Sequence, residues 1–219
     1  FDGFDGLQLL DLAGPADVFS VANMHRPGAY DVSFAGTVKS VRANNGLPFS
    51  LTSLPTVSSV DTVVVPGGFL KFVFGAIGDK ELMAWLRDAA SHAYRTASIC
   101  SGAFVLASLC LRDRKRCGTH WVGIDRLADY APKAIIEKDA LFVEDGNIWT
   151  SAGVTAGSDL ALAMVRRDHG DELAVQVARD IVVQMMRPGT HSQYSTPLAL
   201  QRKPVAGLEN LIPWLESRL

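Results

Sequence analysis

The chain has 219 residues, of which 48% are hydrophobic and 20% charged, and its formal net charge is -2. This composition excludes a disordered or fibrous protein, and the near-zero charge gives this stretch no basic face for gripping nucleic acid. No apolar run approaches the roughly 20 residues of a membrane span. Three cysteines, an odd number, argue against a disulfide framework and favour a reducing compartment, which predicts a cytoplasmic protein.

The first half of the chain alternates short apolar runs with helical patterns. Residues 62–65 are β-branched and stop at Pro66-Gly67-Gly68, which indicates a strand buried on both faces. Residues 79–93 place leucines and alanines on one helical stripe. A second short apolar run at 96–99 is followed by a helical pattern over 100–109. This alternation predicts βαβ units and a mainly parallel sheet.

The second half adds a hairpin and two further helices. Two apolar runs, 141–143 and 148–150, flank the turn residues Asp145-Gly146, which predicts a β-hairpin. Residues 156–167 and 172–186 show helical periodicity, and Pro188-Gly189 ends the second helix.

The end of the chain differs in character. Residues 191–204 are rich in Ser, Thr, Gln and Pro and predict a linker, and helical spacing returns over 208–215. We therefore expect residues 1–195 to form one domain and residues 196–219 to be a linker with the first helix of a truncated helical domain, because one amphipathic helix cannot bury its own apolar face. The first residue is Phe1, not Met, so we expect a piece of a longer gene product.

Cys100-Ser101-Gly102, between a buried strand and a helix, is the strongest local sign of chemistry. A sharp strand-to-helix turn is the geometry of a nucleophile elbow, and a helix N-terminus lowers a thiol pKa. Gly102 would permit the close backbone approach that such a turn needs. The alternative is a small buried cysteine that only packs.

Three other segments offer partners for Cys100. Backbone N–H groups of Gly67 and Gly68 could help to form an oxyanion hole, or the glycines could simply end a strand. His120 could act as general base, or it could be a structural polar residue. Asp11 stands among apolar residues; burial would raise its pKa and could keep it protonated. The alternative for Asp11 is a helix cap ahead of Gly14-Pro15.

Five separated segments carry a family resemblance: LLDLAGPADVF, VVVPGG, ICSGAFVLAS, GTHW and WTSAGVTAGSDLALAMVRRDHG. In order and spacing they resemble the ThiJ/PfpI superfamily, which has the class I glutamine-amidotransferase-like fold, over about residues 4–195. The resemblance implies an α/β, flavodoxin-like three-layer sandwich with a β-hairpin. It implies Cys100 on the elbow, Asp11 as the facing acid and His120 as the nearby imidazole. On this basis, the residues expected to bind a ligand are Gly67, Gly68, Ser101 and Gly102.

Within that superfamily the chain resembles the sensor domains of AraC/XylS-type transcriptional regulators. The segment RPGTHSQYS looks like the end of such a domain, and IPWL resembles the lead-in to the helix-turn-helix pair. This implies a small-molecule effector, a homodimer, DNA binding only through an absent C-terminal domain, and no cofactor. The alternative is a stand-alone cysteine-dependent hydrolase or hydratase similar to the isonitrile hydratases. Ser101, where those members usually have Thr, puts hydratase chemistry in doubt.

The remaining candidates are weaker. No pair of histidines has metal-ligand spacing, so we expect no metal site. The basic cluster at residues 112–116 predicts a solvated loop. Cys110 and Cys117 stand where the family usually has small residues, and we interpret both as packing positions. Among the cysteines we expect Cys100 to be the most reactive: Cys110 lies on an apolar stretch and should be shielded, and Cys117, which follows a basic loop, is its competitor.

Overall fold

The computed structural model describes residues 1–194, 213–214 and 217–218. The predicted boundary at residue 195 and nearly all of the predicted linker and helix beyond it lie outside the described residues. Within the described part, the helices are α1 (Leu9–His25), α2 (Leu70–Gly78), α3 (Lys80–His92), α4 (Ala103–Ser108), α5 (Ile124–Tyr130), α6 (Thr155–His169) and α7 (Asp171–Asp180).

The strands are short. In chain order they are β1 (Ala35–Gly36), β2 (Ser40–Arg42), β3 (Pro48–Ser50), β4 (Thr52–Ser53), β5 (Thr62–Val65), β6 (Arg95–Ile99), β7 (Arg116–Cys117), β8 (Ile135–Ile136), β9 (Phe142–Asp145) and β10 (Ile148–Ser151). The main sheet has the order β5-β6-β10-β9. β5 and β10 pair in parallel with β6, and β9 pairs antiparallel with β10. The predicted mainly parallel sheet and hairpin are therefore confirmed.

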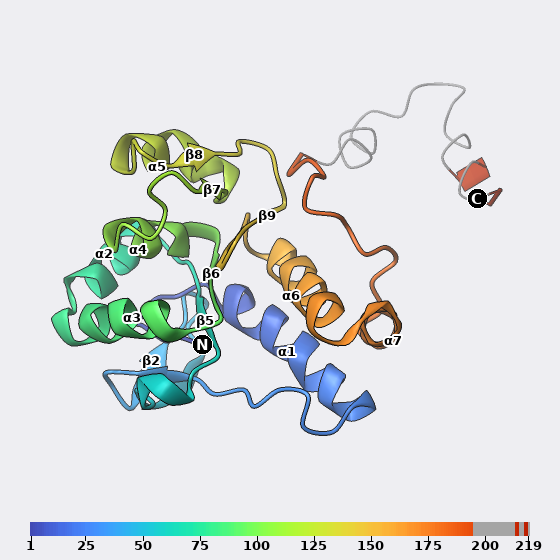
Figure 1. Ribbon diagram of the computed structural model, residues 1–219, viewed down its shortest axis with the longest axis horizontal. Coiled ribbons are helices and arrows are strands. Elements are labelled where there is room, and N and C mark those ends of the chain that lie inside the picture. Colours follow the sequence, from blue (N-terminus) through green and yellow to red (C-terminus); the bar gives the residue numbers. More distant parts are fainter. Residues whose placement is uncertain (195–212, 215–216, 219) are drawn as a thin grey trace.

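Helices cover both faces of this sheet and make three layers (Figure 1). Alternation along β5 separates the two cores: Val63 and Val65 belong to the cluster beneath α2, α3 and α4, and Val64 belongs to the cluster beneath α1, α6 and α7. A strand with apolar residues on both sides suits a sheet that is buried on both faces. The predicted flavodoxin-like three-layer sandwich is confirmed.

The predicted helix over residues 172–186 is wrong in its second half. α7 ends at Asp180, and Val182 adopts a positive φ of 58°. Val182 is 83% exposed, and Val183 and Met185 are exposed too. Ile181 and Met186 pack against the core, but the apolar residues between them do not. Without burial, helical periodicity alone does not hold a helix together.

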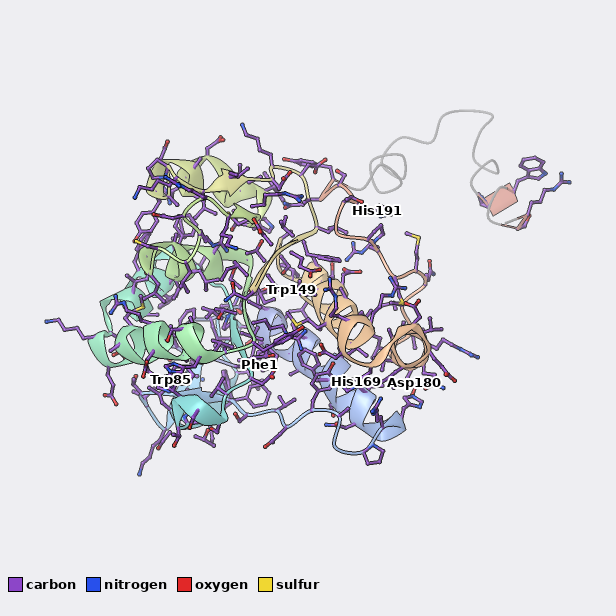
Figure 2. The ribbon with its side chains drawn as sticks, in the orientation of Figure 1. Phe1, Trp85, Trp149, His169, Asp180 and His191 are labelled. Atoms are coloured by element: carbon purple, nitrogen blue, oxygen red, sulfur yellow. The ribbon has the colours of Figure 1, made fainter. Side chains whose placement is uncertain are left out.

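The first residues of the chain extend the sheet beyond β5. The Asp2 N–H donates to the Val64 carbonyl at 2.9 Å, and Asp2 also bridges Ala35 in parallel. A cavity of about 770 Å3 opens next to this segment. Phe1 and His169, both labelled in Figure 2, line the cavity together with Arg95.

Candidate functional site

Cys100 directly follows β6 and makes the sharp turn that the sequence predicted. Its φ is +55°, a left-handed conformation that costs a non-glycine residue roughly 1–2 kcal/mol. A short 3-10 turn, Cys100–Gly102, leads into α4. Gly102 packs so closely that a Cβ there would lie 2.3 Å from the Val65 carbonyl oxygen. The expected close approach at Gly102 is thus present, and only glycine fits it.

A second loop closes over the elbow from β10. Because Ser151 is in register with Ile99, the residues that follow the two parallel strands meet at the same edge of the sheet. Gly153 has a φ of +92°, and a Cβ on it would lie 2.2 Å from the Cys100 Cβ. The next residue, Val154, also has a positive φ, of 54°. The close approach of the loop at Gly153 and Val154 to Cys100 was not predicted from the sequence, although a glycine just after a predicted strand could have indicated it.

Asp11 lies within the first turns of α1 and is fully buried. Its two oxygens accept hydrogen bonds from the Gly67 N–H at 3.1 Å and the Val154 N–H at 2.7 Å. These bonds cross to other segments, so the helix-cap alternative is wrong. Burial raises the pKa of Asp11 to about 6, partly offset by the two N–H donors. The predicted rise in the pKa of Asp11 is therefore confirmed, and a pKa of about 6 leaves mainly the carboxylate at neutral pH.

The Cys100 thiol is neutral in this setting. Burial raises its pKa to about 12, and both the charge of Asp11 and the hydrogen bond to Asp11 add to the rise. The expected helix-terminus effect is small because α4 spans only Ala103–Ser108. The thiol is thus a hydrogen-bond donor to the carboxylate, and the prediction of a lowered pKa is wrong.

The two glycine amides proposed for an oxyanion hole are already engaged. Gly67 donates to Asp11, and Gly68 donates to the Ser101 hydroxyl oxygen at 2.9 Å. That hydroxyl lies 2.6 Å from the Gly68 carbonyl, to which it donates. Ser101 therefore fastens the Gly68 loop to the elbow. In this arrangement neither amide is open to a ligand, so the predicted oxyanion hole is not formed by these groups.

His120 lies in the neighbouring loop and is half-buried. Burial lowers its pKa, and its Nδ1 accepts a hydrogen bond from the Val122 N–H at 3.3 Å. In the neutral ring the proton is then on Nε2, which makes this atom a donor and not a base. No hydrogen bond joins His120 and Cys100 within residues 1–194; the link is the Thr119 hydroxyl, which donates to the Cys100 carbonyl at 2.8 Å.

The basic cluster is only partly a solvated loop. The side chain of Arg112 is 1% exposed. Its guanidinium donates to the Ser98 hydroxyl at 2.6 Å and to the Gly118 carbonyl at 3.4 Å. Cys117 beside it is buried, as a packing residue should be, whereas Cys110 is exposed. The expectation that Cys110 is shielded is therefore wrong.

The large cavity lies away from this site. It is lined by Arg95 and Thr62, the first residues of β6 and β5, whereas Cys100 follows the last residue of β6. Arg95 forms a buried ion pair with Asp168 there. The described residues contain no cluster of three or more His, Cys, Asp or Glu side chains that could hold a metal ion. None of their helices has the length and apolarity to cross a membrane.

The structure is thus a three-layer α/β sandwich in which a cysteine with a positive φ, at the turn between a strand and a helix, faces a buried carboxylate. The chain belongs to the DJ-1/PfpI family, whose model matches residues 3–167. Its relatives include both regulators and an enzyme.

One relative is the HTH-type transcriptional regulator CdhR of Pseudomonas aeruginosa, 34% identical over 151 residues, which are 68% of this chain and 43% of the regulator. The chain thus spans less than half of that regulator. Another is an isonitrile hydratase of Pseudomonas putida, 32% identical over 172 residues, or 78% of this chain and 72% of the enzyme. Among solved structures, an AraC family transcriptional regulator from Pseudomonas putida has a TM-score of 0.75 at 24% identity and covers 83% of this chain and 97% of that one.

Proposed function

We propose that residues 1–195 form the ligand-sensing domain of an AraC-type transcriptional regulator. In this proposal residues 196–219 lead into a DNA-binding domain supplied by further residues. The similarity to several HTH-type regulators supports the regulatory assignment. The small-molecule effector would bind at the elbow, beside Cys100, Ser101 and His120.

The observation that carries the proposal is the resting state of Cys100. Burial and the neighbouring Asp11 carboxylate raise the pKa of the Cys100 thiol, which disfavours the nucleophilic thiolate. The amides of Gly67 and Gly68, which were expected to form an oxyanion hole, are also occupied by Asp11 and Ser101. Such a site suits recognition by hydrogen bonds more than covalent turnover.

A second candidate is a cysteine-dependent hydratase. It is favoured by the direct contact between Cys100 and Asp11 and by the similarity to the isonitrile hydratase. In that case water would add to an isonitrile to give an N-substituted formamide, with Asp11 and Cys100 moving the protons.

One experiment separates the two candidates. The purified chain is incubated with cyclohexyl isonitrile, and the formamide is measured by chromatography against a Cys100→Ala control. We expect no formamide above the control. Multiple turnovers that disappear in Cys100→Ala would refute the sensor assignment. In parallel, a library of small polar molecules is screened by thermal shift, and we expect hits whose stabilisation is lost in Cys100→Ala or His120→Ala.

The assembly and DNA expectations belong to the same proposal. Regulators that bind paired half-sites need two-fold symmetry, so we expect a cytoplasmic homodimer through this domain. A monomer in light scattering at micromolar concentration would count against it. We also expect no operator-specific gel shift from residues 1–219 alone at physiological salt, since the chain's net charge is -2.

A further inference from the structure

One side chain joins the end of the described domain to the loop that carries His120. The Gln193 amide nitrogen donates to the Thr119 carbonyl at 3.0 Å and to the Ala140 carbonyl at 3.1 Å. Its amide oxygen accepts from the Trp121 N–H at 2.9 Å. Three hydrogen bonds from one glutamine make a rigid connection between segments more than 70 residues apart in sequence.

The groups that Gln193 binds are the two peptide units that flank His120. The Thr119 carbonyl belongs to the peptide before His120, and the Trp121 N–H belongs to the peptide after it. Fixing both units fixes the backbone of His120, which has φ -58° and ψ 138°. The direction of the imidazole therefore depends on Gln193.

The same loop is fastened to the elbow on its other side. The Thr119 hydroxyl donates to the Cys100 carbonyl at 2.8 Å, and the Thr119 side chain is fully buried. A continuous set of hydrogen bonds thus runs from Cys100 through Thr119 to Gln193. Tyr194, one residue further, packs its ring 5.8 Å from Trp121.

We propose that Gln193 is a positioning residue for His120 and that it couples the Cys100 site to the terminal segment 188–194. The coupling half rests on the proposed sensing function. A ligand that moves His120 or Thr119 then changes the hydrogen bonds that Gln193 makes. By reciprocity, a displacement of this terminal segment changes the affinity of the site.

Anchoring of the terminal segment does not by itself require the Gln193 side chain. Asp139 accepts hydrogen bonds from the Ser192 hydroxyl at 2.9 Å and from the Gln193 N–H at 3.0 Å. An antiparallel bridge between Ala140 and Ser192 adds to this hold. The two side chains therefore have separable roles: Ser192 anchors the segment, and Gln193 reaches the His120 loop.

The positioning half is tested by NMR titration of the histidines in the full 219-residue chain. Gln193→Met keeps the length of the side chain and removes its three hydrogen bonds, and Ser192→Ala is the matched control in the same segment. Because a released loop admits water, we expect the lowered pKa of His120 to rise in Gln193→Met and to stay unchanged in Ser192→Ala. An unchanged His120 titration in Gln193→Met, or an equal shift in both variants, would overturn the positioning role.

The proposed coupling is tested by attaching a small group to the Cys100 sulfur. At pH 9, with complete modification confirmed by mass spectrometry, methyl methanethiosulfonate converts the Cys100 thiol to a methyl disulfide and releases methanesulfinate. Cys110→Ser and Cys117→Ala in the background confine the reaction to Cys100. Amide hydrogen exchange is then followed over residues 188–194. We expect a change of roughly fivefold or more on modification, and none when Gln193→Met is added.

The outcomes separate this proposal from the sensing assignment. Unchanged exchange after modification refutes coupling even when the His120 titration supports positioning. Turnover of cyclohexyl isonitrile refutes the sensing assignment and leaves the His120 titration as a separate test of positioning.

Discussion

Replacing Asp11 with asparagine tests the electrostatics of the elbow. The substitution removes the negative charge and the strongest acceptor beside the thiol. These are the two effects of Asp11 that add to burial in raising the pKa of Cys100 to about 12. We therefore expect the thiol pKa to fall and Cys100 to react faster in Asp11→Asn than in the wild type.

The size of the effect follows from the pKa. With a pKa near 12, only about one Cys100 in ten thousand is a thiolate at pH 8. Removing a carboxylate in contact lowers a pKa by roughly 1–3 units, so a fall of about 2 raises the thiolate fraction about a hundredfold. A less basic thiolate is also a weaker nucleophile, by roughly a factor of eight over 2 units. The net expectation is an alkylation rate about tenfold higher.

The assay is iodoacetamide alkylation between pH 7 and 10, followed by mass-spectrometric mapping of each cysteine. In Asp11→Asn an amide nitrogen replaces one carboxylate oxygen and cannot accept a hydrogen bond, so either the Gly67 or the Val154 N–H loses its acceptor, at a cost of roughly 1–3 kcal/mol in stability. Asp159→Asn is the matched control, since Asp159 is also buried but pairs with Arg187. A Cys100 rate that is unchanged or slower in folded Asp11→Asn, or equally raised in Asp159→Asn, would refute this account of the thiol.

Three further predictions concern stability and reactivity. Gly153→Ala should lower the free energy of unfolding in urea by about 3 kcal/mol or more, because the new Cβ would lie 2.2 Å from the Cβ of Cys100. Gly170 has the same φ of 92° but no atom within 4 Å of the place where a Cβ would lie, so Gly170→Ala should cost only about 1–2 kcal/mol. Equal losses in the two variants would contradict the close approach. Asp2 has its pKa raised from 3.8 to about 7 by burial, so the folded state keeps this proton to higher pH than the unfolded state. The free energy of unfolding should therefore fall by about 3 kcal/mol between pH 4 and pH 7 on its account. Urea titrations at pH 4.5 and 7.5 should show a much smaller fall in Asp2→Asn, and a fall as large as that of the wild type would show that Asp2 is not the source. In the wild type, the exposed Cys110 should be alkylated by iodoacetamide before Cys100 at pH 7.5; mass mapping that finds Cys100 modified first would reverse that order.

Local sequence patterns correctly predicted the strand ends and the strand-to-helix turn that position the site. The β-branched run at residues 62–65, the Pro66 stop and the Cys100-Ser101-Gly102 turn each carry their own backbone preferences, so the strand ends and the elbow follow from short segments. The parallel sheet then brings such strand ends to one edge.

The electrostatics of the site could not be predicted in the same way. The state of Cys100 depends on the depth of burial and on contact with Asp11, which lies 89 residues earlier in the chain. The contact between the Gly153 loop and Cys100 depends on the register of β10 with β6. Arg112 was expected in a solvated loop, yet the Ser98 hydroxyl near the end of β6 and the nearby Gly118 carbonyl accept hydrogen bonds from its buried guanidinium. Each of these features arises from long-range contacts.

The shape of the elbow is set by glycines and not by the thiol. A Cβ at Gly67 would lie 2.7 Å from the Ser101 nitrogen, one at Gly102 would lie 2.3 Å from the Val65 carbonyl oxygen, and Gly153 faces the Cβ of Cys100. The nearest atom at Gly67 and at Gly102 is a backbone atom, and at Gly153 it is the Cβ of Cys100, which alanine and serine both keep. Alanine or serine at position 100 should therefore keep the same backbone path. The backbone geometry of the turn is therefore independent of the sulfur that it presents. A change of the side chain at position 100 can alter the chemistry of the site while the fold around it stays the same.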